Sequence, residues 1–444
     1  MFAIADKSGL RQYAGMTHGI TDCREERGID VAQHSVPASG GSTPRPPRID
    51  SVDLLRGLVM VIMVLDHVRD FAFSGTLHGN SPTDLAHASA AVILTRWITH
   101  FCAPAFVFLA GTSACLQRLR GVSRSALVRF LVTRGLWLIV LELTVVRFGK
   151  DFSFSQVGLG VLWALGCSMI ALAGLLYLPH WAIATFGLTL VLGHNLFDRF
   201  GVVSATHGRG QASAVAATSG GAIWSLLHVQ GTILPFGPLG PHIGVGYPLV
   251  PWIGVIALGY LFGMVYAWDA VRRQALLVRL GLVLTAAFVV LRGINMYGDA
   301  SPWSTQASTV MTVLSFLNVT KYPPSLLFLL MTLGPAIALL AWLERPFRGR
   351  VARDLVTFGR VPLFYYVTQW YVAHMLTLGL SFAMGRPKAY LLGGSAATAP
   401  AEAGFGLGTT FMIYLASIVV LYPLCVWYGG VKQRRRDLWW LSYL

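Results

Sequence analysis

Long apolar segments, separated by short polar stretches, make up most of the chain after residue 48. Ten of them are long enough to cross about 30 Å of hydrocarbon as a helix, since each helical residue rises about 1.5 Å. The pattern therefore predicts an all-α polytopic membrane protein, a bundle of about ten transmembrane helices. The predicted spans are 52–73, 92–116, 127–148, 156–177, 180–197, 247–268, 274–294, 322–343, 355–379 and 404–428.

The two ends of the chain and one long connection differ from this pattern. Residues 1–48 mix charges with Ser, Gly and Pro, which predicts a disordered cytoplasmic tail. The transmembrane domain is expected to fill 49–430, followed by a short basic tail at 431–444. The connection over about 198–246 becomes apolar near 222–237 but is too short there to span, which favours a re-entrant or interfacial segment.

Basic residues between the spans orient the predicted bundle. Lys and Arg accumulate in the cytoplasmic loops of membrane proteins. With ten spans, three arginine-bearing loops and the C-terminal KQRRR all lie on the side of the N-terminus. Both termini are therefore predicted to be cytoplasmic, in a multi-pass protein of a bacterial inner (plasma) membrane. The loop arginines are Arg118, Arg120, Arg124, Arg129, Arg272, Arg273, Arg279, Arg345, Arg348, Arg350, Arg353 and Arg360.

Composition agrees with a membrane protein and limits the other classes. Of 444 residues, 55% are hydrophobic and only 12% are charged, whereas a soluble domain carries about 25% charge. The net charge of +15 would suit a nucleic-acid partner, but the basic residues lie in short loops between apolar spans, so none is expected. The five cysteines have no paired spacing and nothing resembles a zinc-ligand set, so we expect neither a disulfide framework nor a metal cofactor.

Four ionisable residues form a polar stripe along one side of the first span: Asp53, Arg56, His67 and Asp70. Arg56 and His67 are eleven positions apart, almost three helical turns, so they share one face roughly 16 Å apart along the axis. Ionisable groups cost roughly 2.5–3.5 kcal/mol each in hydrocarbon and normally face a protein interior or a wet cavity. The stripe is therefore the first candidate for a functional site.

The two ends of the stripe indicate different roles. Arg56, near the predicted cytoplasmic end, can hold the phosphates of a donor, and Asp53 can pair with it. His67 lies deeper and can act as a general base, because neutral imidazole accepts a proton near pH 7; the alternative is a core histidine bonded to a backbone carbonyl. His100 enters from the outer side of the second span at a similar depth, beside Pro104, which is expected to kink that helix.

Other polar residues in or near the spans are further candidates. Glu142 in the third span is expected to cross-link spans. Lys321, at the outer mouth of the eighth span, either extends to the membrane interface or binds an acceptor. Together with Asp70 at the outer end of the stripe and His228 in the predicted re-entrant segment, Lys321 is assigned to substrate binding.

Two stretches, SVDLLRGLVMVIMVLDH at 51–67 and THFCAPAFVFLAGTSA at 99–114, resemble the heparan-alpha-glucosaminide N-acetyltransferase catalytic-domain family of bacterial membrane proteins. The Arg56-x10-His67 spacing also resembles the Arg-x10-His signature of the acyltransferase-3 group of membrane acyltransferases. Further family-like stretches occur at 134–149, 247–263 and 316–336, so the resemblance extends from about 50 to 430.

The resemblance implies transfer of an acetyl group from cytosolic acetyl-CoA to a hydroxyl or amine, commonly of a sugar, on the outer side of the membrane. It implies that Arg56 serves the donor and that His67 transfers the proton; Arg134, on the inner side of the third span, can then join Arg56 at a CoA phosphate. In heparan-type enzymes the catalytic histidine follows this signature by a short interval, which adds His78 as a candidate. Those enzymes have asparagine at the position of His67, so at this position the chain is closer to the acyltransferase-3 arrangement. The base is thus one of His67, His78 and His100, and the implied partners are acetyl-CoA, a carbohydrate or other small polar acceptor, and membrane lipid.

Two other functions stay open on the residues alone. A proton-coupled secondary transporter of a small polar solute would use the same histidines and acids as a proton relay, and would show flux without consuming a thioester. A lipid- or glycan-binding scaffold would tolerate the loss of Arg56 and His67.

Overall fold

A computed structural model describes the folded part of the chain. The chain divides into two units, Met1–Pro46 and Pro47–Leu444. The first unit lies outside the described residues, and so does the predicted tail over 1–48. In the second unit the structure describes residues 50–154, 156–200, 219–233, 242–345, 349–394, 399–435, 437–438 and 441.

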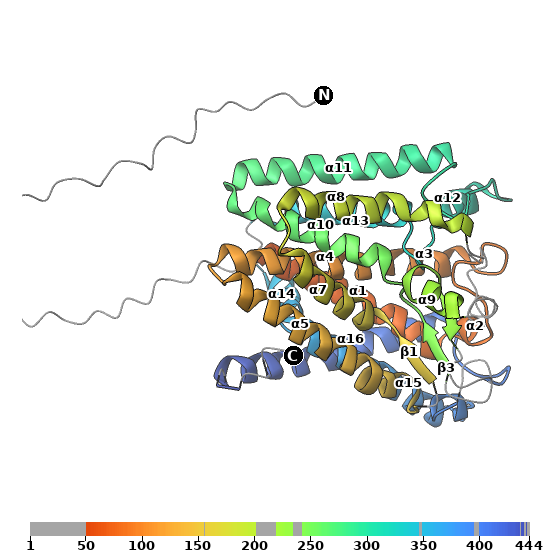
Figure 1. Ribbon diagram of the computed structural model, residues 1–444. Helices are drawn as coiled ribbons and strands as arrows, with labels where there is room; N and C mark the ends of the chain where they lie inside the picture. Colours follow the sequence, from red (N-terminus) through yellow and green to blue (C-terminus); the bar gives the residue numbers. More distant parts are fainter. Residues whose placement is uncertain are drawn as a thin grey trace, which may run out of the picture. The chain divides into compact units, whose positions relative to one another are not determined.

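The described part is mostly helical (Figure 1), as the sequence predicts. Its α-helices are α1 (Asp50–Ala72), α2 (Ser74–Leu77), α3 (Ala90–Thr99), α4 (Cys102–Leu119), α5 (Arg124–Leu141), α6 (Arg147–Asp151), α7 (Val161–Leu175), α8 (His180–Gly193), α9 (Ser219–Leu227), α10 (Val250–Phe262), α11 (Ala270–Ile294), α12 (Thr309–Leu317), α13 (Leu326–Leu343), α14 (Arg350–Arg360), α15 (Pro362–Ala383) and α16 (Leu407–Arg434). A π-helical segment forms η1 (Glu142–Val146), and short 3-10 helices form η2 (His194–Phe200), η4 (Gly263–Ala267) and η5 (Ala389–Leu391).

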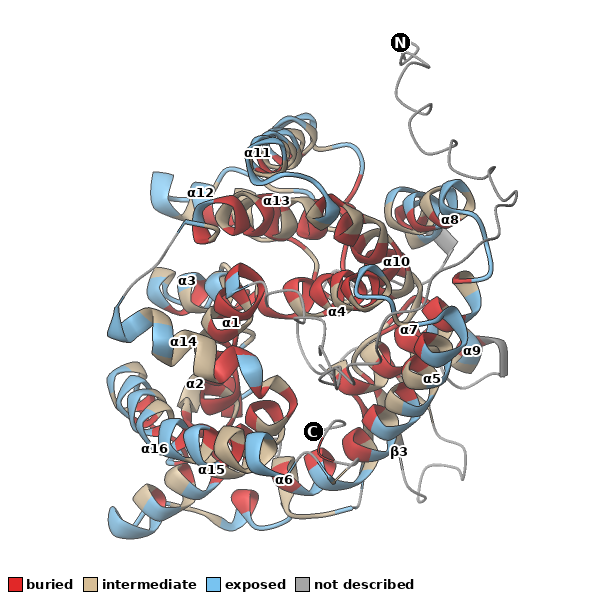
Figure 2. Ribbon diagram, turned by 90° about the vertical axis from the view of Figure 1, so that its left-hand side faces the viewer, coloured by how far each residue is buried: buried red, intermediate tan, exposed pale blue. Residues whose placement is uncertain are grey.

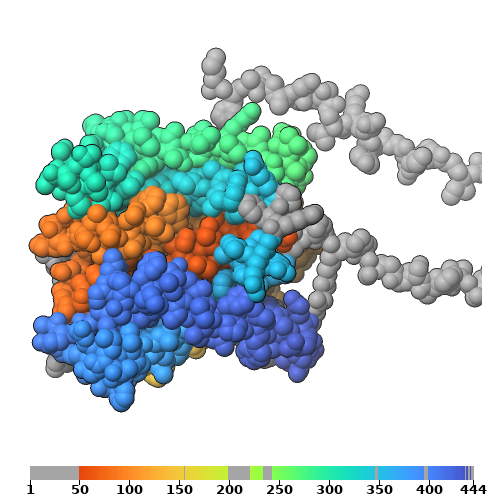
Figure 3. Space-filling view, turned by 180° about the vertical axis from the view of Figure 1, so that it is seen from behind, coloured from red at the N-terminus to blue at the C-terminus, as the bar shows by residue number. Residues whose placement is uncertain are grey.

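Five helical segments among the described residues are long and apolar enough to cross a membrane. They are Ala90–Leu119, Val250–Ala267, Ala270–Ile294, Leu326–Leu343 and Leu407–Arg434. The membrane class is therefore supported, whereas the predicted number of ten spans is not. In α11 and α16 only 17% and 28% of the apolar window is buried in protein. Figure 3 shows both at the surface, in green and blue, with orange N-terminal helices between them. Exposed apolar faces of this kind suit contact with lipid.

Several predicted spans correspond to broken helices. The span at 92–116 is divided into α3 and α4 at His100 and Phe101, four and three positions before Pro104. Proline lacks an N–H and its ring clashes with the carbonyl four residues before it, which explains the break. The span at 355–379 is likewise divided into α14 and α15, immediately before Pro362.

A small sheet corrects one helical prediction and includes part of the segment predicted as re-entrant or interfacial. Strands β1 (Gln156–Leu159), β2 (Gly231–Ile233) and β3 (His242–Val245) lie in the order β1-β3-β2, with β1 parallel and β2 antiparallel to β3. The span predicted from 156 therefore begins as a strand, and α7 starts only at Val161. The segment predicted as re-entrant or interfacial near 222–237 is α9 followed by β2, with 234–237 outside the described residues.

Helix α1 is held in the interior by close contacts at glycines. Figure 2 shows α1 and α4 largely buried, whereas α11 and α16 carry exposed faces. A Cβ atom at Gly57 would lie 1.9 Å from the carbonyl oxygen of Leu355 in α14, and one at Gly359 would lie 1.9 Å from that of Asp53. Such close backbone approach is typical of small residues between membrane helices.

Substituting Gly57 by alanine is expected to destabilise the protein by about 1–3 kcal/mol, because the new methyl group forces α1 away from α14. Thermal unfolding of the detergent-purified protein measures the effect. Gly379→Ala in α15 is the matched control, since a Cβ there meets no atom within 4 Å and alanine favours the helix by roughly 0.5–1 kcal/mol. Equal unfolding temperatures for the two variants would contradict the close packing.

Candidate functional site

The polar stripe of α1 faces protein. Helix α1 packs against α3, α4, α13, α14, α15 and α16. The side chains of Asp53 and His67 are buried, with residue exposures of 2% and 9%. These ionisable side chains of α1 therefore lie against protein, as is usual for ionisable groups in such helices.

A cavity of about 420 Å³, here the histidine cavity, lies beside the second half of α1. Both His67 and His100 line it. Four basic and two acidic side chains give its wall a net positive charge, and aromatic rings from α15 and backbone from β1 and β3 complete it. The charged residues are Arg69, Arg96, Lys150, Lys321, Asp66 and Asp70, and the α15 rings are Tyr366 and Trp370.

His67 lies against two aromatic residues of α15. Its ring stacks on Trp370 with centroids 3.7 Å apart, and it meets Tyr366 edge to face at 6.1 Å. Its Nδ1 is buried and makes no well-formed hydrogen bond within the described part of the chain. The hydrogen bond to a backbone carbonyl that a core histidine would make is therefore not found at Nδ1 of His67. A held imidazole at the wall of a polar cavity is suited to proton transfer.

His100 lies where α3 gives way to α4, with its ring edge to face against Phe328 at 5.2 Å. It is 2% exposed, and neither ring nitrogen has a hydrogen-bond partner among the described residues. Buried polar atoms without a hydrogen-bond partner are costly, so such atoms usually form a hydrogen bond to water or to a ligand. The position at the wall of the histidine cavity provides access to either.

Asp66 is the centre of an ion cluster in this wall. Its carboxylate accepts hydrogen bonds from Arg69 and from Nη1 of Arg96, 2.6 Å away, and from the hydroxyl of Thr99 at 3.2 Å. Nζ of Lys321 lies 3.7 Å from it. One anion thus holds three cations from α1, α3 and the segment before α13. Lys321 is 7% exposed and pairs with Asp66 inside this cluster.

A second cavity of about 290 Å³, here the arginine cavity, lies beside the first half of α1. Its basic side chains are Arg56, Arg134, Arg360 and Lys432. Arg56 donates to the carbonyl of Leu109 at 3.2 Å and to the hydroxyl of Ser113, and pairs with Asp53 at 3.4 Å. Asp53 does not line this cavity in the described structure, so its contact with the site is through Arg56.

Two residues belong to the walls of both cavities. Val161, at the start of α7, and Tyr366, on α15, line the histidine cavity on one side and the arginine cavity on the other. His67 touches the ring of Tyr366. The two cavities therefore adjoin at the point where His67 lies.

A third cavity of about 940 Å³ adjoins the histidine cavity through shared residues that include Asp70, Lys150 and Trp370. His78 lines this third cavity and not the histidine cavity; it is exposed, and its Nε2 lies 3.0 Å from the carbonyl of Pro400. The structure thus brings His67, His100, Asp70 and Lys321 together and places His78 at a wider opening beside them.

Glu142 connects helices, as the sequence predicts. It accepts a hydrogen bond from the backbone N–H of Leu162 at 3.0 Å, in the first turn of α7, and one from Lys150 at 3.0 Å. Nζ of Lys150 also lies over the ring of Trp370, 4.7 Å from its centroid. Glu142 therefore fixes a cation where the histidine cavity and the third cavity meet.

Sequence reasoning missed several residues of the site. Asp66 was not among the candidate residues, although α1 has neighbours on several faces and the Asp66 carboxylate contacts cations from α3 and from the segment before α13. Tyr366 and Trp370 were not considered, although they are four positions apart on one helical face, a spacing that indicates a shared surface. His228, a predicted substrate ligand, does not line the histidine cavity; it lies with His194 and Asp198.

Comparison with known proteins gives a family match. The family model described as "Heparan-alpha-glucosaminide N-acetyltransferase, catalytic" matches residues 48–297. The match is longer than half of the chain and includes Arg56, His67, His100 and Arg134. No curated protein matches the sequence.

Proposed function

Because this chain belongs to the heparan-alpha-glucosaminide N-acetyltransferase catalytic family, we propose that it transfers an acetyl group from acetyl-CoA to an amine or hydroxyl of a sugar or glycan. The observation that carries the proposal is the pair of adjoining cavities that share Tyr366 and Val161. A two-substrate transfer requires two binding sites that meet at one reacting point.

The arginine cavity is the proposed donor site. Acetyl-CoA carries a pyrophosphate and a further phosphate, and guanidinium groups bind phosphate oxygens in pairs of hydrogen bonds. Arg56 and Arg134 provide such groups, with Arg360 and Lys432 adding positive charge. Asp53 orients Arg56 rather than contacting the donor. The acetyl thioester then points toward Tyr366 and the histidine cavity.

The histidine cavity is the proposed acceptor site. His67 takes a proton from the acceptor amine or hydroxyl, whose lone pair forms a bond to the thioester carbonyl carbon. The carbon–sulfur bond then breaks, and the leaving CoA thiolate takes the proton from His67 to give free CoA. Arg96 and Lys321, with their positive charge at the wall, stabilise the oxyanion of the tetrahedral intermediate. Asp70 and the polar lining bind the acceptor, and His100 adds a second imidazole.

The two cavities also support a direction across the membrane. Helix α1 begins at the arginine cavity and runs toward the histidine cavity. We place its start on the cytoplasmic side, with both termini, because the arginine-rich loops follow the positive-inside rule. The acceptor would then be modified on the outer side of a bacterial inner membrane, with helices beyond the five strongly apolar ones completing a bundle of about ten spans.

The activity is tested on the full chain purified in detergent, with acetyl-CoA and glucosamine, by measuring free CoA with a thiol reagent. CoA is expected to appear only when the acceptor is present, and the acetylated sugar in equal amount. A transporter would consume no thioester, so proton-coupled flux of the sugar without CoA release would overturn the proposal.

Arg56→Met and Arg134→Met are each expected to raise the KM for acetyl-CoA about tenfold or more, since a charge-assisted hydrogen bond contributes about 1.5–3 kcal/mol, while the KM for the acceptor changes little. Initial rates at varied acetyl-CoA measure this. Arg279→Met, an exposed arginine of α11, is the matched control. Unchanged donor KM in both variants would remove the arginine cavity as the CoA site.

A further inference from the structure

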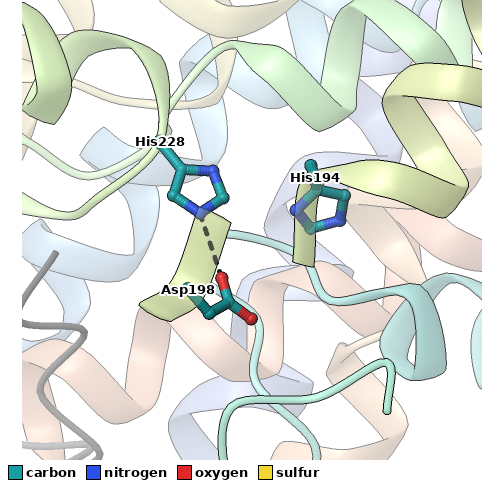
Figure 4. Close-up of side chains that lie close together, drawn as sticks. All are labelled: His194, Asp198 and His228. Carbon is teal, nitrogen blue, oxygen red and sulfur yellow. Dashed lines mark hydrogen bonds and ion pairs between the residues drawn. The ribbon is translucent and has the colours of Figure 1, made fainter. Parts of the chain in front are cut away.

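Three potential metal ligands meet near the end of α8, away from both cavities. His194 and Asp198 lie four residues apart on η2, and His228 follows the last residue of α9 (Figure 4). One ligand atom from each lies within 4.8 Å of the others. None of the three lines the histidine cavity or the arginine cavity in the described structure.

The carboxylate is already held in place. Its Oδ1 lies 3.0 Å from Nε2 of His228, and its Oδ2 accepts a hydrogen bond from Nδ2 of Asn195 at 2.8 Å. Asn195 is itself fixed, because its Oδ1 accepts the backbone N–H of Leu326 at 2.9 Å. Metal-binding carboxylates are usually oriented by a second hydrogen bond of this kind.

His194 is the observation that indicates a missing ligand. It is 1% exposed, and both of its ring nitrogens are buried without a well-formed hydrogen bond among the described residues; the one backbone group that interacts with its ring is that of Pro324. Figure 4 shows its ring beside His228 and Asp198, and the two imidazole centroids are 5.7 Å apart. One weak backbone contact leaves at least one nitrogen of this buried imidazole unsatisfied, which is costly unless a ligand lies between it and its neighbours.

We propose that His194, Asp198 and His228 bind a divalent metal ion, with Zn²⁺ as the fitting ion. Two imidazoles and one carboxylate are donors that zinc accepts, with a water in the fourth position. Bonds of about 2.0–2.1 Å in a tetrahedron place donor atoms about 3.3 Å apart. The pair of His228 and Asp198 already has nearly this spacing, and a rotation of His194 brings in the third ligand.

The ion would anchor a segment of the histidine cavity. It joins η2 to the end of α9, and two residues after His228 the side chain of Gln230 lines that cavity and donates to the carbonyl of Gly246 at 3.1 Å. Trp224 packs on His228, with ring centroids 4.8 Å apart, and His228 is 1% exposed. The ion would fix α9 and β2 against the bundle. Sequence reasoning missed it because His228 is remote in sequence from the other two ligands.

The test measures metal content and stability of the full chain in detergent. After treatment with EDTA and addition of ZnCl₂, the wild-type protein is expected to retain about one zinc per chain after desalting, and zinc is expected to raise its unfolding temperature. His194→Gln and His228→Gln are expected to lose both effects. His180→Gln, an exposed histidine at the start of α8, is the matched control and should keep them.

Two further measurements keep the test decisive if a variant folds poorly. Cobalt bound to the wild-type protein is expected to give visible absorption that zinc removes, and the affinity is expected to fall at acidic pH, because metal binding displaces protons from imidazole. Zinc retained equally by His194→Gln and wild type would overturn the proposal. So would the absence of zinc binding, or of any zinc-dependent change in unfolding, in the wild-type chain.

Discussion

His67→Gln is expected to lower kcat for acetyl transfer by about 10²–10⁴-fold, the usual contribution of a general base. Glutamine keeps much of the size and polarity of the side chain but takes up no proton near neutral pH. The KM for acetyl-CoA should change little, because the arginine cavity lies on the other side of Tyr366. Initial rates of CoA release at saturating glucosamine measure kcat.

The other candidate histidines provide the comparison. His78→Gln is expected to change kcat only a few-fold, because His78 is exposed and lines the third cavity. His100→Gln should lower the rate less than His67→Gln, since His100 packs on Phe328 rather than on the shared Tyr366. If His78→Gln lost activity while His67→Gln retained more than a tenth of it, His78 would replace His67 as the base.

Asp66→Asn is expected to destabilise the protein by about 3–5 kcal/mol, because it leaves buried cations without their counter-charge. The carboxylate contacts Arg69, Arg96 and Lys321, and no other single side chain among the described residues contacts all three. The fall in unfolding temperature in detergent measures the effect. Asp437→Asn is the control: it removes an exposed ion pair with Arg435, of a kind that contributes about 0–1 kcal/mol.

A second substitution separates loss of charge balance from loss of shape. In the Asp66→Asn background, Lys321→Met removes one of the uncompensated cations and is expected to restore part of the stability. Contacting residues typically show a coupling of about 0.5–3 kcal/mol in such a cycle. Strict additivity of the two changes would show that Lys321 and Asp66 do not act as a pair.

Sequence reasoning located the helices that carry the site but only part of the site itself. The first span was predicted at 52–73, and α1 is Asp50–Ala72. The prediction was close because an apolar run of this length indicates a single helix. The break at His100 followed from Pro104. Both predictions depend on local physics, namely helix periodicity and the missing N–H of proline.

What sequence reasoning could not provide depends on contacts between distant segments. Strand β1 was included in a helix because a short apolar run fits either structure; its partner β3 lies more than 80 residues later. The cations around Asp66 come from α1, α3 and the segment before α13, so no spacing along the chain reveals them. Which face of a helix lines the candidate site depends on the helices packed against it, and a single sequence does not identify those helices.

The shared wall at Tyr366 has a consequence for the permeability of the membrane. In the proposed reaction the donor and the acceptor lie in separate cavities, so only a two-carbon group would pass this point, and neither CoA nor the sugar would cross. The aromatic ring and the side chain of Val161 would then keep the bilayer closed to ions throughout turnover. On that proposal, a cell would use a cytoplasmic metabolite to modify an external sugar without discharging its proton gradient.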